Sequence, residues 1–200
     1  MVKLNLVNES QAHLTRKIGV DSTDLHQFLR FRLQPNFTAV IEIAAREAKL
    51  RVGAASPLVI RVTELINISI DVVVPMPHLP PAVMGVYNWR GKILWIVDLA
   101  MLLGLTDRIA DRHHRHLQPT IVITSAATTG SEAQTIGFVV DEIFDIEWCR
   151  SDLMIEPIAD QFHPEQSQWV RGYAISATGE KLAILDGQAM IECANLHADI

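Results

Sequence analysis

The sequence contains little cysteine and little positive charge, and both shortages exclude classes of protein. Its 200 residues include only Cys149 and Cys193, which lie too far apart for a zinc motif and are too few for a disulfide framework. We therefore expect two reduced, structural thiols. The formal net charge is −6, whereas nucleic acids and anionic lipids select surfaces with clustered Lys and Arg. We expect no nucleic-acid partner.

Long hydrophobic runs are also missing. No run approaches the roughly 18 apolar residues that cross a membrane. The N-terminal segment MVKLNLVNES has too short an apolar run for a signal peptide. The sequence therefore predicts a cytoplasmic protein with no direct membrane insertion.

The motifs of common active sites are absent as well. The sequence has no Gly-x-Ser-x-Gly elbow, no Cys nucleophile signature and no Gly-rich phosphate loop. We therefore expect no catalytic residue, no cofactor and no metal.

One histidine cluster leaves an alternative open. His113, His114 and His116 lie in the charged connection from Thr106 to Gln118, and imidazoles are common metal ligands. A metal-dependent hydrolase using these three residues is the alternative function, and a solvated loop is the other interpretation.

Short runs rich in Val and Ile dominate what is present. Hydrophobic residues make up 49% of the chain, and β-branched residues in short runs favour strands over long helices. We therefore predict a mainly β fold, with a short helix possible over Ala44 to Leu50. The expected strands are Phe28 to Leu33, Thr38 to Ile43, Leu58 to Ile70, Lys92 to Leu99, Thr120 to Ala126, Gln134 to Trp148, Trp169 to Ser176 and Lys181 to Leu185.

Glycines and aspartates mark the turns between these strands. Gly137 marks a point where a side chain would not fit or where the strand bends. Gly179 can take the positive φ of a hairpin turn. Asp98 and Asp186 follow apolar strands, where turn or helix-capping roles are common. Arg30 alternates with apolar residues and is expected to face water.

Two parts of the chain echo each other. Gly85-Val86-Tyr87, Gly91 and an apolar run ending at Asp98 correspond to Gly172-Tyr173-Ala174, Gly179 and an apolar run ending at Asp186. Both copies predict a strand, a tight turn, an apolar strand and an acid that could begin a helix. Two similar small barrels would explain the echo, and chance is the alternative, because Gly, Leu and Asp are common residues.

The segment from Pro75 to Leu105 carries a family resemblance. It reads PMPHLPPAVMGVYNWRGKILWIVDLAMLLGL, and TIVITSA, IGFVVDEIFDIEW and VRGYAISATGEKLAILD follow in order. This succession resembles the CheW-like family of chemotaxis coupling proteins, over about Phe28 to Ala189. The Tyr-Asn-Trp-Arg-Gly segment is similar to cyanobacterial members, which serve phototaxis or pilus-driven twitching motility.

The resemblance implies both a fold and a function. The fold is two interleaved five-stranded SH3-like β-barrels with short helices. The function is that of a non-catalytic scaffold between the cytoplasmic tip of a methyl-accepting receptor and the regulatory domain of a CheA-type histidine kinase. Such a protein is cytoplasmic and is recruited to membrane receptor arrays.

The resemblance also implies a receptor-binding surface. Glu64 and Arg90 match family positions linked to receptor contact, and Val62, Gly85 and Asn88 lie in or beside the same surface. Three of these residues have another interpretation: Gly85 can serve a tight backbone turn, Arg90 can pair with a surface acid, and Asn88 can be structural.

We expect the chain to consist of three parts. Residues 1–26 are expected to form an N-terminal tail or arm, residues 27–190 the single domain with two barrels, and residues 191–200 a helix end or tail. The segment of residues 44–57 is an insertion relative to the family, and it lies just before the strand that contains Glu64.

Overall fold

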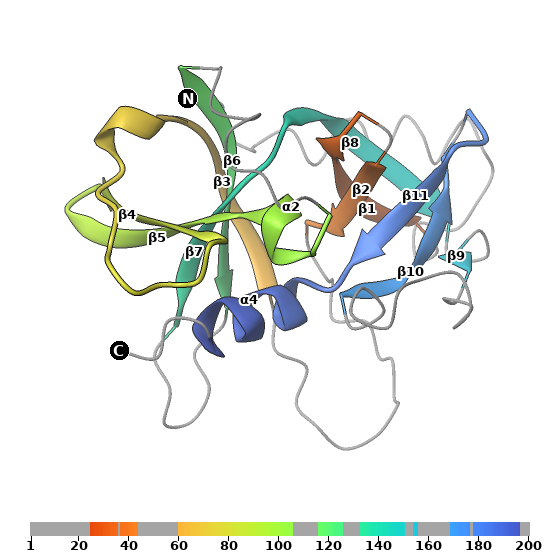
Figure 1. Cartoon of the computed structure of the whole chain (residues 1–200). Coiled ribbons are helices and arrows are strands. Elements are labelled where there is room, and N and C mark those ends of the chain that lie inside the picture. The colour runs from red at the N-terminus through yellow and green to blue at the C-terminus, as the bar shows by residue number, and fades with distance from the viewer. Residues whose placement is uncertain are drawn as a thin grey trace.

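The computed structural model describes two small β-barrels built from interleaved parts of the chain. The described residues are 25–35, 37–43, 60–105, 116–125, 133–150, 154–155, 169–176 and 178–196. Figure 1 shows the two barrels side by side, with strands from both ends of the chain in one barrel and the central strands in the other. The predicted helix over Ala44 to Leu50 lies outside the described residues.

The first barrel contains strands from the beginning and the end of the chain. Within the described residues its strand order is β8-β1-β2-β11-β10-β9. The β2–β11 pair is parallel and the other pairs are antiparallel. The strands are β1 (Leu25–Gln34), β2 (Phe37–Glu42), β8 (Glu142–Arg150), β9 (Met154–Ile155), β10 (Val170–Ile175) and β11 (Lys181–Leu185).

The second barrel is formed by the middle of the chain. Its described strands are ordered β3-β6-β7-β5-β4. They are β3 (Ile60–Ser69), β4 (Val83–Trp89), β5 (Lys92–Asp98), β6 (Leu117–Ser125) and β7 (Thr135–Val139), with the 3-10 helix η1 (Ile70–Val72) after β3. Leu117 and Gln118, expected in a charged connection, therefore belong to β6, where they pair with Ser69 and Ile68.

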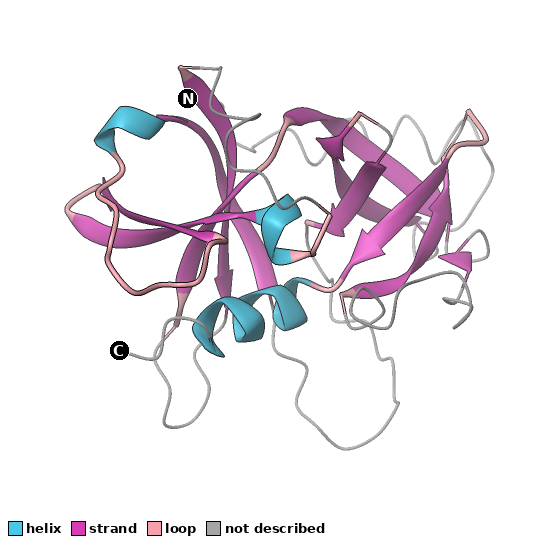
Figure 2. Ribbon diagram, viewed as in Figure 1, coloured by secondary structure: helices cyan, strands magenta, loops and turns pink. Residues whose placement is uncertain are grey.

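Two short helices lie where the barrels meet (Figure 2). Asp98 Oδ1 accepts a hydrogen bond from Met101 N at 3.0 Å and caps α2 (Leu99–Leu102). Asp186 Oδ1 accepts from the backbone N–H groups of Gln188 and Ala189 at the start of α4 (Gly187–Leu196). The predicted capping roles of both aspartates are confirmed. Among the described residues, no helix is long and apolar enough to cross a membrane.

Three apolar clusters make up the core of the residues that the structure describes. One cluster contains buried residues of the first sheet only, such as Phe28, Val40 and Leu182, and another contains residues of the second barrel only, such as Leu94 and Val122. The largest cluster draws residues from both sheets and both helices. Burial of this shared surface, at roughly 25 cal/mol per Å², stabilises the two barrels as one unit.

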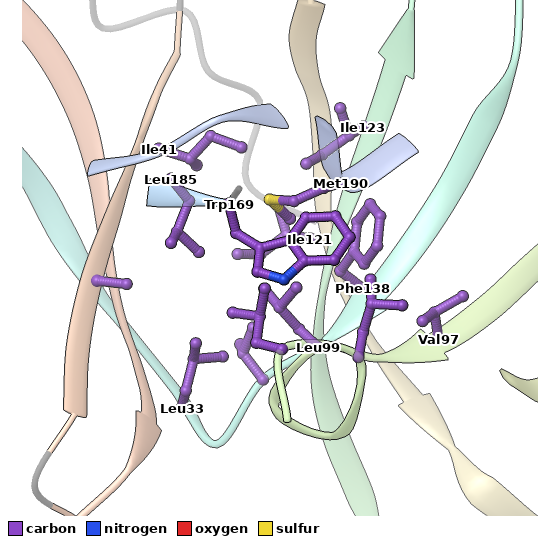
Figure 3. Packing of buried hydrophobic residues seen from close by; sticks show 14 of the residues in the cluster. Leu33, Ile41, Val97, Leu99, Ile121, Ile123, Phe138, Trp169, Leu185 and Met190 are labelled. Atoms are coloured by element: carbon purple, nitrogen blue, oxygen red, sulfur yellow. The ribbon is translucent and has the colours of Figure 1, made fainter. Parts of the chain in front are cut away.

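The shared cluster is centred on an aromatic side chain. Trp169 is 6% exposed. Figure 3 shows its ring among Ile121, Leu185 and Met190, which belong to the second barrel, the first barrel and the C-terminal helix and to the same cluster.

The predicted single strand from Gln134 to Trp148 is wrong. It is two strands, β7 and β8, in different sheets. Val140 N donates to Pro119 O of the second barrel at 3.0 Å, and the next amide, Asp141 N, donates to Arg32 O of the first barrel at 2.9 Å. The change of partner between these two residues is the physical reason for the break. The hairpin of β6 with β7 is confirmed.

The first-barrel arginine Arg30 is less exposed than predicted. Its side chain is 23% exposed, because Glu147 lies 3.7 Å from its Nη1 and Glu180 is bound by its Nη2. Carboxylates on β8 and in the turn between β10 and β11 thus replace part of the expected water shell.

The sequence echo has a counterpart in the structure. Gly85 and Gly172 occupy matching places at register shifts, where β4 meets β5 and β10 meets β11. Each glycine also lies against the carbonyl of a third segment, Val74 O in one barrel and Ile155 O in the other. The two barrels therefore close in the same way, although the origin of the echo by duplication stays a prediction.

The domain boundaries stay a prediction too. Strand β1 begins at Leu25, within the expected tail of residues 1–26, and α4 continues across the boundary at 190 to Leu196.

Candidate functional site

The candidate site begins with the tight turn between β4 and β5. The last cross-strand pair is Trp89 with Lys92, so Arg90 and Gly91 alone make the turn. Their φ angles are 56° and 79°, as two-residue turns that match strand twist require. Asn88 Oδ1 accepts a hydrogen bond from Gly91 N at 2.9 Å and holds the turn. Asn88 therefore stabilises the backbone conformation of this turn.

This turn places Arg90 against Glu64. Arg90 Nη2 lies 2.8 Å from Glu64 Oε1, and its guanidinium carbon is 5.2 Å from the centroid of the Trp89 ring. Glu64 is on β3, and Arg90 follows β4, the strands at the two ends of the second sheet. The pair therefore joins the two edges of this sheet.

The two members of the pair differ in exposure. The Arg90 side chain is 57% exposed and that of Glu64 16%. An exposed ion pair typically contributes under about 1 kcal/mol to folding. More than half of the Arg90 side chain remains available to a binding partner while its position is fixed. We call Glu64, Asn88 and Arg90 the charged corner.

The other two predicted site residues lie inside the protein. Val62 is 7% exposed and belongs to the shared core cluster. Gly85 has a φ of 140°, and a Cβ there would be 2.1 Å from Val74 O. Val74 and Val86 exchange two backbone hydrogen bonds, at 2.8 and 2.9 Å, directly beside it. The structure thus gives both residues a supporting role and brings only Glu64 and Arg90 into direct contact.

An exposed apolar surface next to this turn was missed by the sequence reasoning. Val74 pairs with Val86, and Val86 pairs with Trp95, so these three side chains line up on one face across three segments. Ile93, two residues before Trp95, shares that face and is 74% exposed, while Val74 is 59% exposed. We call Val74, Val86, Ile93 and Trp95 the apolar row.

A signal for the apolar row was present in the sequence. Lys92 to Val97 has apolar residues on both faces, and Leu94 and Ile96 fill the barrel interior. Trp95 packs at the shared cluster, whereas Trp89 packs at the cluster inside the second barrel. A strand that is apolar on both faces needs a partner on each.

The histidine cluster that suggested a metal site lies only partly in the described part of the chain. His113 and His114 lie outside it, and His116 is exposed, with Nδ1 3.2 Å from Asp71 Oδ2. No group of three His, Cys, Asp or Glu side chains that could hold a metal occurs among the described residues.

Neither Cys149 nor Cys193 forms a disulfide in the described part of the chain. Burial, with a smaller contribution from Glu147, raises the pKa of Cys149 to about 11, and burial also raises the pKa of Cys193. A thiol with a raised pKa is a poor nucleophile at neutral pH. This chemistry agrees with two structural thiols.

Comparison with known proteins gives related sequences and a related fold. A family model described as CheW-like domain matches residues 57–194. The chemotaxis protein CheW of Rhizobium meliloti (strain 1021) is 30% identical over 112 residues, which cover 56% of this chain and 64% of that protein. A probable chemotaxis protein CheW of Rhizobium etli is 33% identical over 97 residues, covering 48% of this chain and 56% of that protein. The chain thus spans less than two thirds of both curated relatives.

A solved structure shows the same architecture. The scaffolding protein TtCheW from Thermoanaerobacter tengcongensis superposes with a TM-score of 0.55 at 16% identity, over 80% of this chain and 88% of that chain. The predicted pair of SH3-like β-barrels is confirmed, with the two-residue strand β9 as a sixth strand in the first sheet.

Proposed function

Because the chain belongs to the CheW-like domain family, we propose that it is a non-catalytic adaptor in chemotaxis-type signalling. It bridges the cytoplasmic tip of a methyl-accepting receptor and the regulatory domain of a CheA-type histidine kinase. It acts in the cytoplasm and is recruited to receptor arrays at the membrane.

One observation carries this proposal: the second barrel presents two exposed surfaces of different chemistry. The charged corner holds a fixed guanidinium beside a carboxylate. The apolar row exposes Ile93 and Val74, and exposed apolar patches of this kind mark sites of protein association. An adaptor needs at least two such surfaces, because it must bind two partners together.

We assign the charged corner to the receptor. Arg90 is held by Glu64, Trp89 and a turn with fixed geometry, so little side-chain entropy remains to be lost on binding. Its planar guanidinium can hydrogen-bond to carboxylates and carbonyls of a partner helix.

We assign the apolar row to the kinase regulatory domain. Its contribution comes from removal of apolar surface from water, which needs no matching charge. A charged side chain introduced into such a contact would be buried without a partner and would oppose binding.

The test is co-purification of the chain with a receptor cytoplasmic fragment and, separately, with the kinase regulatory domain. Arg90→Ala is expected to weaken receptor binding several-fold and leave kinase binding unchanged, and Ile93→Glu is expected to do the reverse. Arg171→Ala is a matched control, because that arginine is 59% exposed and also pairs with a glutamate, Glu42, but on the first barrel. Ile155→Glu, at an exposed position of the first barrel, is the control for Ile93→Glu.

Either of two results would contradict the assignment. Receptor binding by Arg90→Ala equal to that of Arg171→Ala would exclude the charged corner as the receptor site. Failure of the unmodified chain to bind both partners would exclude the adaptor function itself.

The finer part of the proposal concerns the pathway. The similarity of Tyr87 to Gly91 to cyanobacterial members supports phototaxis or pilus-driven twitching motility. Deletion of the gene is then expected to abolish directed movement and leave pilus assembly intact, and unchanged movement towards light would argue against this pathway.

A further inference from the structure

The first barrel exposes an aromatic side chain that neither proposed adaptor surface includes. Phe144 on β8 is 42% exposed, and β8 is the strand at one end of the first sheet. Single exposed apolar side chains are common on protein surfaces. A function for Phe144 therefore depends on how the surrounding residues hold it.

A β-bulge sets the position of Phe144. Two residues, Phe144 and Asp145, face the single residue Arg30 where the register between β1 and β8 shifts. Asp145 Oδ1 accepts a hydrogen bond from Ile146 N at 2.7 Å, which holds the carboxylate at the bulge. Bulges redirect side chains and interrupt strand pairing at sheet edges. The bulge therefore favours contact with a partner through side chains over the addition of a further strand.

Two arginines of β1 hold the ring. The guanidinium carbons of Arg30 and Arg32 lie 5.3 and 5.5 Å from the centroid of the Phe144 ring, within the range of a cation–π contact. Arg32 is fixed in turn by Asp141, with 3.0 Å between Arg32 Nε and Asp141 Oδ2, and by Glu142. The ring is thus both exposed and held in place, so little side-chain entropy is lost when a partner covers it.

Carboxylates form the outer part of this surface. The side chains of Arg30 and Arg32 are 23% and 29% exposed, whereas those of Glu180 and Glu142, which they bind, are 41% and 42% exposed. Asp145 is exposed as well, and a hydrogen bond to a neutral backbone amide leaves its charge in place. Negative charge around the ring favours a cationic partner and opposes anionic lipid and nucleic acid. The net charge of −6 also opposes docking of a second copy of the chain.

We propose that Phe144, with Glu142 and Asp145 beside it, is a docking surface for a protein segment that carries lysine or arginine next to an apolar side chain. The apolar side chain covers the ring, and the cation pairs with the exposed carboxylates. Rigid aromatic side chains and arginines of this kind are enriched where interfaces gain most of their binding energy. The proposal is independent of the adaptor function, because these residues lie on the other barrel from the charged corner and the apolar row.

The test uses the basic peptide acetyl-Lys-Leu-Lys-Leu-Lys-amide as the probe. One matched control peptide has glutamate in place of lysine, and the other has serine in place of leucine. Each is titrated into the ¹⁵N-labelled whole chain, and the chemical shifts of the backbone amides report the site and the affinity. The probe is expected to shift the amides of Phe144, Asp145 and Ile146 and to bind about tenfold more tightly than either control.

Variants with matched controls complete the test. Phe144→Ser is expected to weaken binding of the probe about tenfold, whereas Ile155→Ser, at a 45% exposed position of the first barrel, should leave it unchanged. Asp145→Asn keeps an oxygen that can accept from Ile146 N, and it is expected to weaken binding about threefold. Asp71→Asn removes an exposed acid from the second barrel and should have no effect.

Several results would overturn the proposal. They are no binding of the probe, shifts at the apolar row in place of the bulge, and equal binding by Phe144→Ser and Ile155→Ser. Equal affinity for the probe and either control peptide would also overturn it, because charge or apolar contact alone would then explain the binding. Dimers of the unmodified chain in sedimentation velocity that Phe144→Ser abolishes would assign the surface to a second copy instead.

Discussion

Substitution of Gly85 by alanine gives the sharpest test of how the second barrel closes. A Cβ at this position would be 2.1 Å from Val74 O and 2.7 Å from Val74 C. Both atoms are backbone, so they cannot move away as the end of a flexible side chain could. The substitution must therefore separate Val74 from Val86 or bend β4.

The expected cost has two parts. A positive φ costs an L-residue roughly 1–2 kcal/mol, and the φ of Gly85 is 140°. Loss of the two hydrogen bonds between Val74 and Val86 costs about 1 kcal/mol each. The free energy of unfolding should therefore fall by about 3–4 kcal/mol, a large part of the roughly 5–15 kcal/mol of a typical domain.

The chain contains matched controls for each part. Gly91 has a φ of 79°, and a Cβ added there would have nothing within 4 Å, so Gly91→Ala isolates the conformational cost. Gly172, the counterpart in the first barrel, would place its Cβ 2.8 Å from Ile155 O without a positive φ, so Gly172→Ala isolates the close approach. Gly85→Ala should destabilise the protein more than either.

Urea unfolding followed by tryptophan fluorescence measures these differences. With an m-value of about 2 kcal/mol/M, the midpoint of Gly85→Ala should fall by roughly 1.5–2 M. A decrease no larger than that of Gly91→Ala would refute the close approach of Val74. The result also bears on the proposed receptor surface, because loss of receptor binding by this variant would then report a disrupted barrel and not a lost contact.

Three further predictions test the core, a helix cap and a thiol. Trp169→Ala removes the ring at the centre of the shared cluster and should lower the free energy of unfolding by about 3–5 kcal/mol; two separate unfolding transitions in the unmodified chain would contradict the shared core. Asp186→Ala removes the oxygen that accepts two backbone N–H groups of α4 and should cost about 1 kcal/mol in urea unfolding, and an unchanged midpoint would exclude a stabilising cap. Burial raises the pKa of Cys149 from 9.0 to about 11, so folding favours the protonated thiol. Its contribution to the free energy of unfolding, up to about 3 kcal/mol, is fully present below pH 9 and is lost as the pH rises from 9 to 11. The unmodified protein should thus lose more stability over this pH range than Cys149→Ala, and parallel losses would show that the thiol does not contribute.

Local sequence patterns predicted most of the strands and both caps, because those features depend on neighbouring residues. Alternation of apolar side chains located the strands, and Asp98 and Asp186 stood where a short polar side chain can accept the first free amides of a helix. The sequence also indicated that a side chain would not fit at Gly137. A Cβ there would lie 2.9 Å from Ile96 Cδ1 and 3.1 Å from Thr120 Cγ2.

Non-local pairing could not be predicted in the same way. The segment IGFVVDEIF has the composition of a single strand on both sides of Asp141, and only the choice of hydrogen-bond partner divides it. Likewise, Val74 and Val86 are separated by a proline-rich segment, so nothing local shows that they pair and place Trp95 in the same row.

The candidate site was anticipated through the family resemblance. Glu64 and Arg90 are 26 positions apart, and no periodicity links them; their contact arises because the second sheet curls until its end strands meet. The sequence could indicate that Gly85 tolerates unusual backbone geometry, but not which carbonyl approaches it.

The change of partner at Val140 and Asp141 has a mechanical consequence. Two successive backbone amides donate hydrogen bonds to different barrels, so the barrels are joined there by a single peptide unit with no intervening loop. Together with the shared core, this junction leaves no flexible linker at that point about which the barrels could rotate. We expect a force applied at the tip of the β4–β5 turn to move both barrels as one stiff body, so that the protein transmits displacement across its length instead of absorbing it.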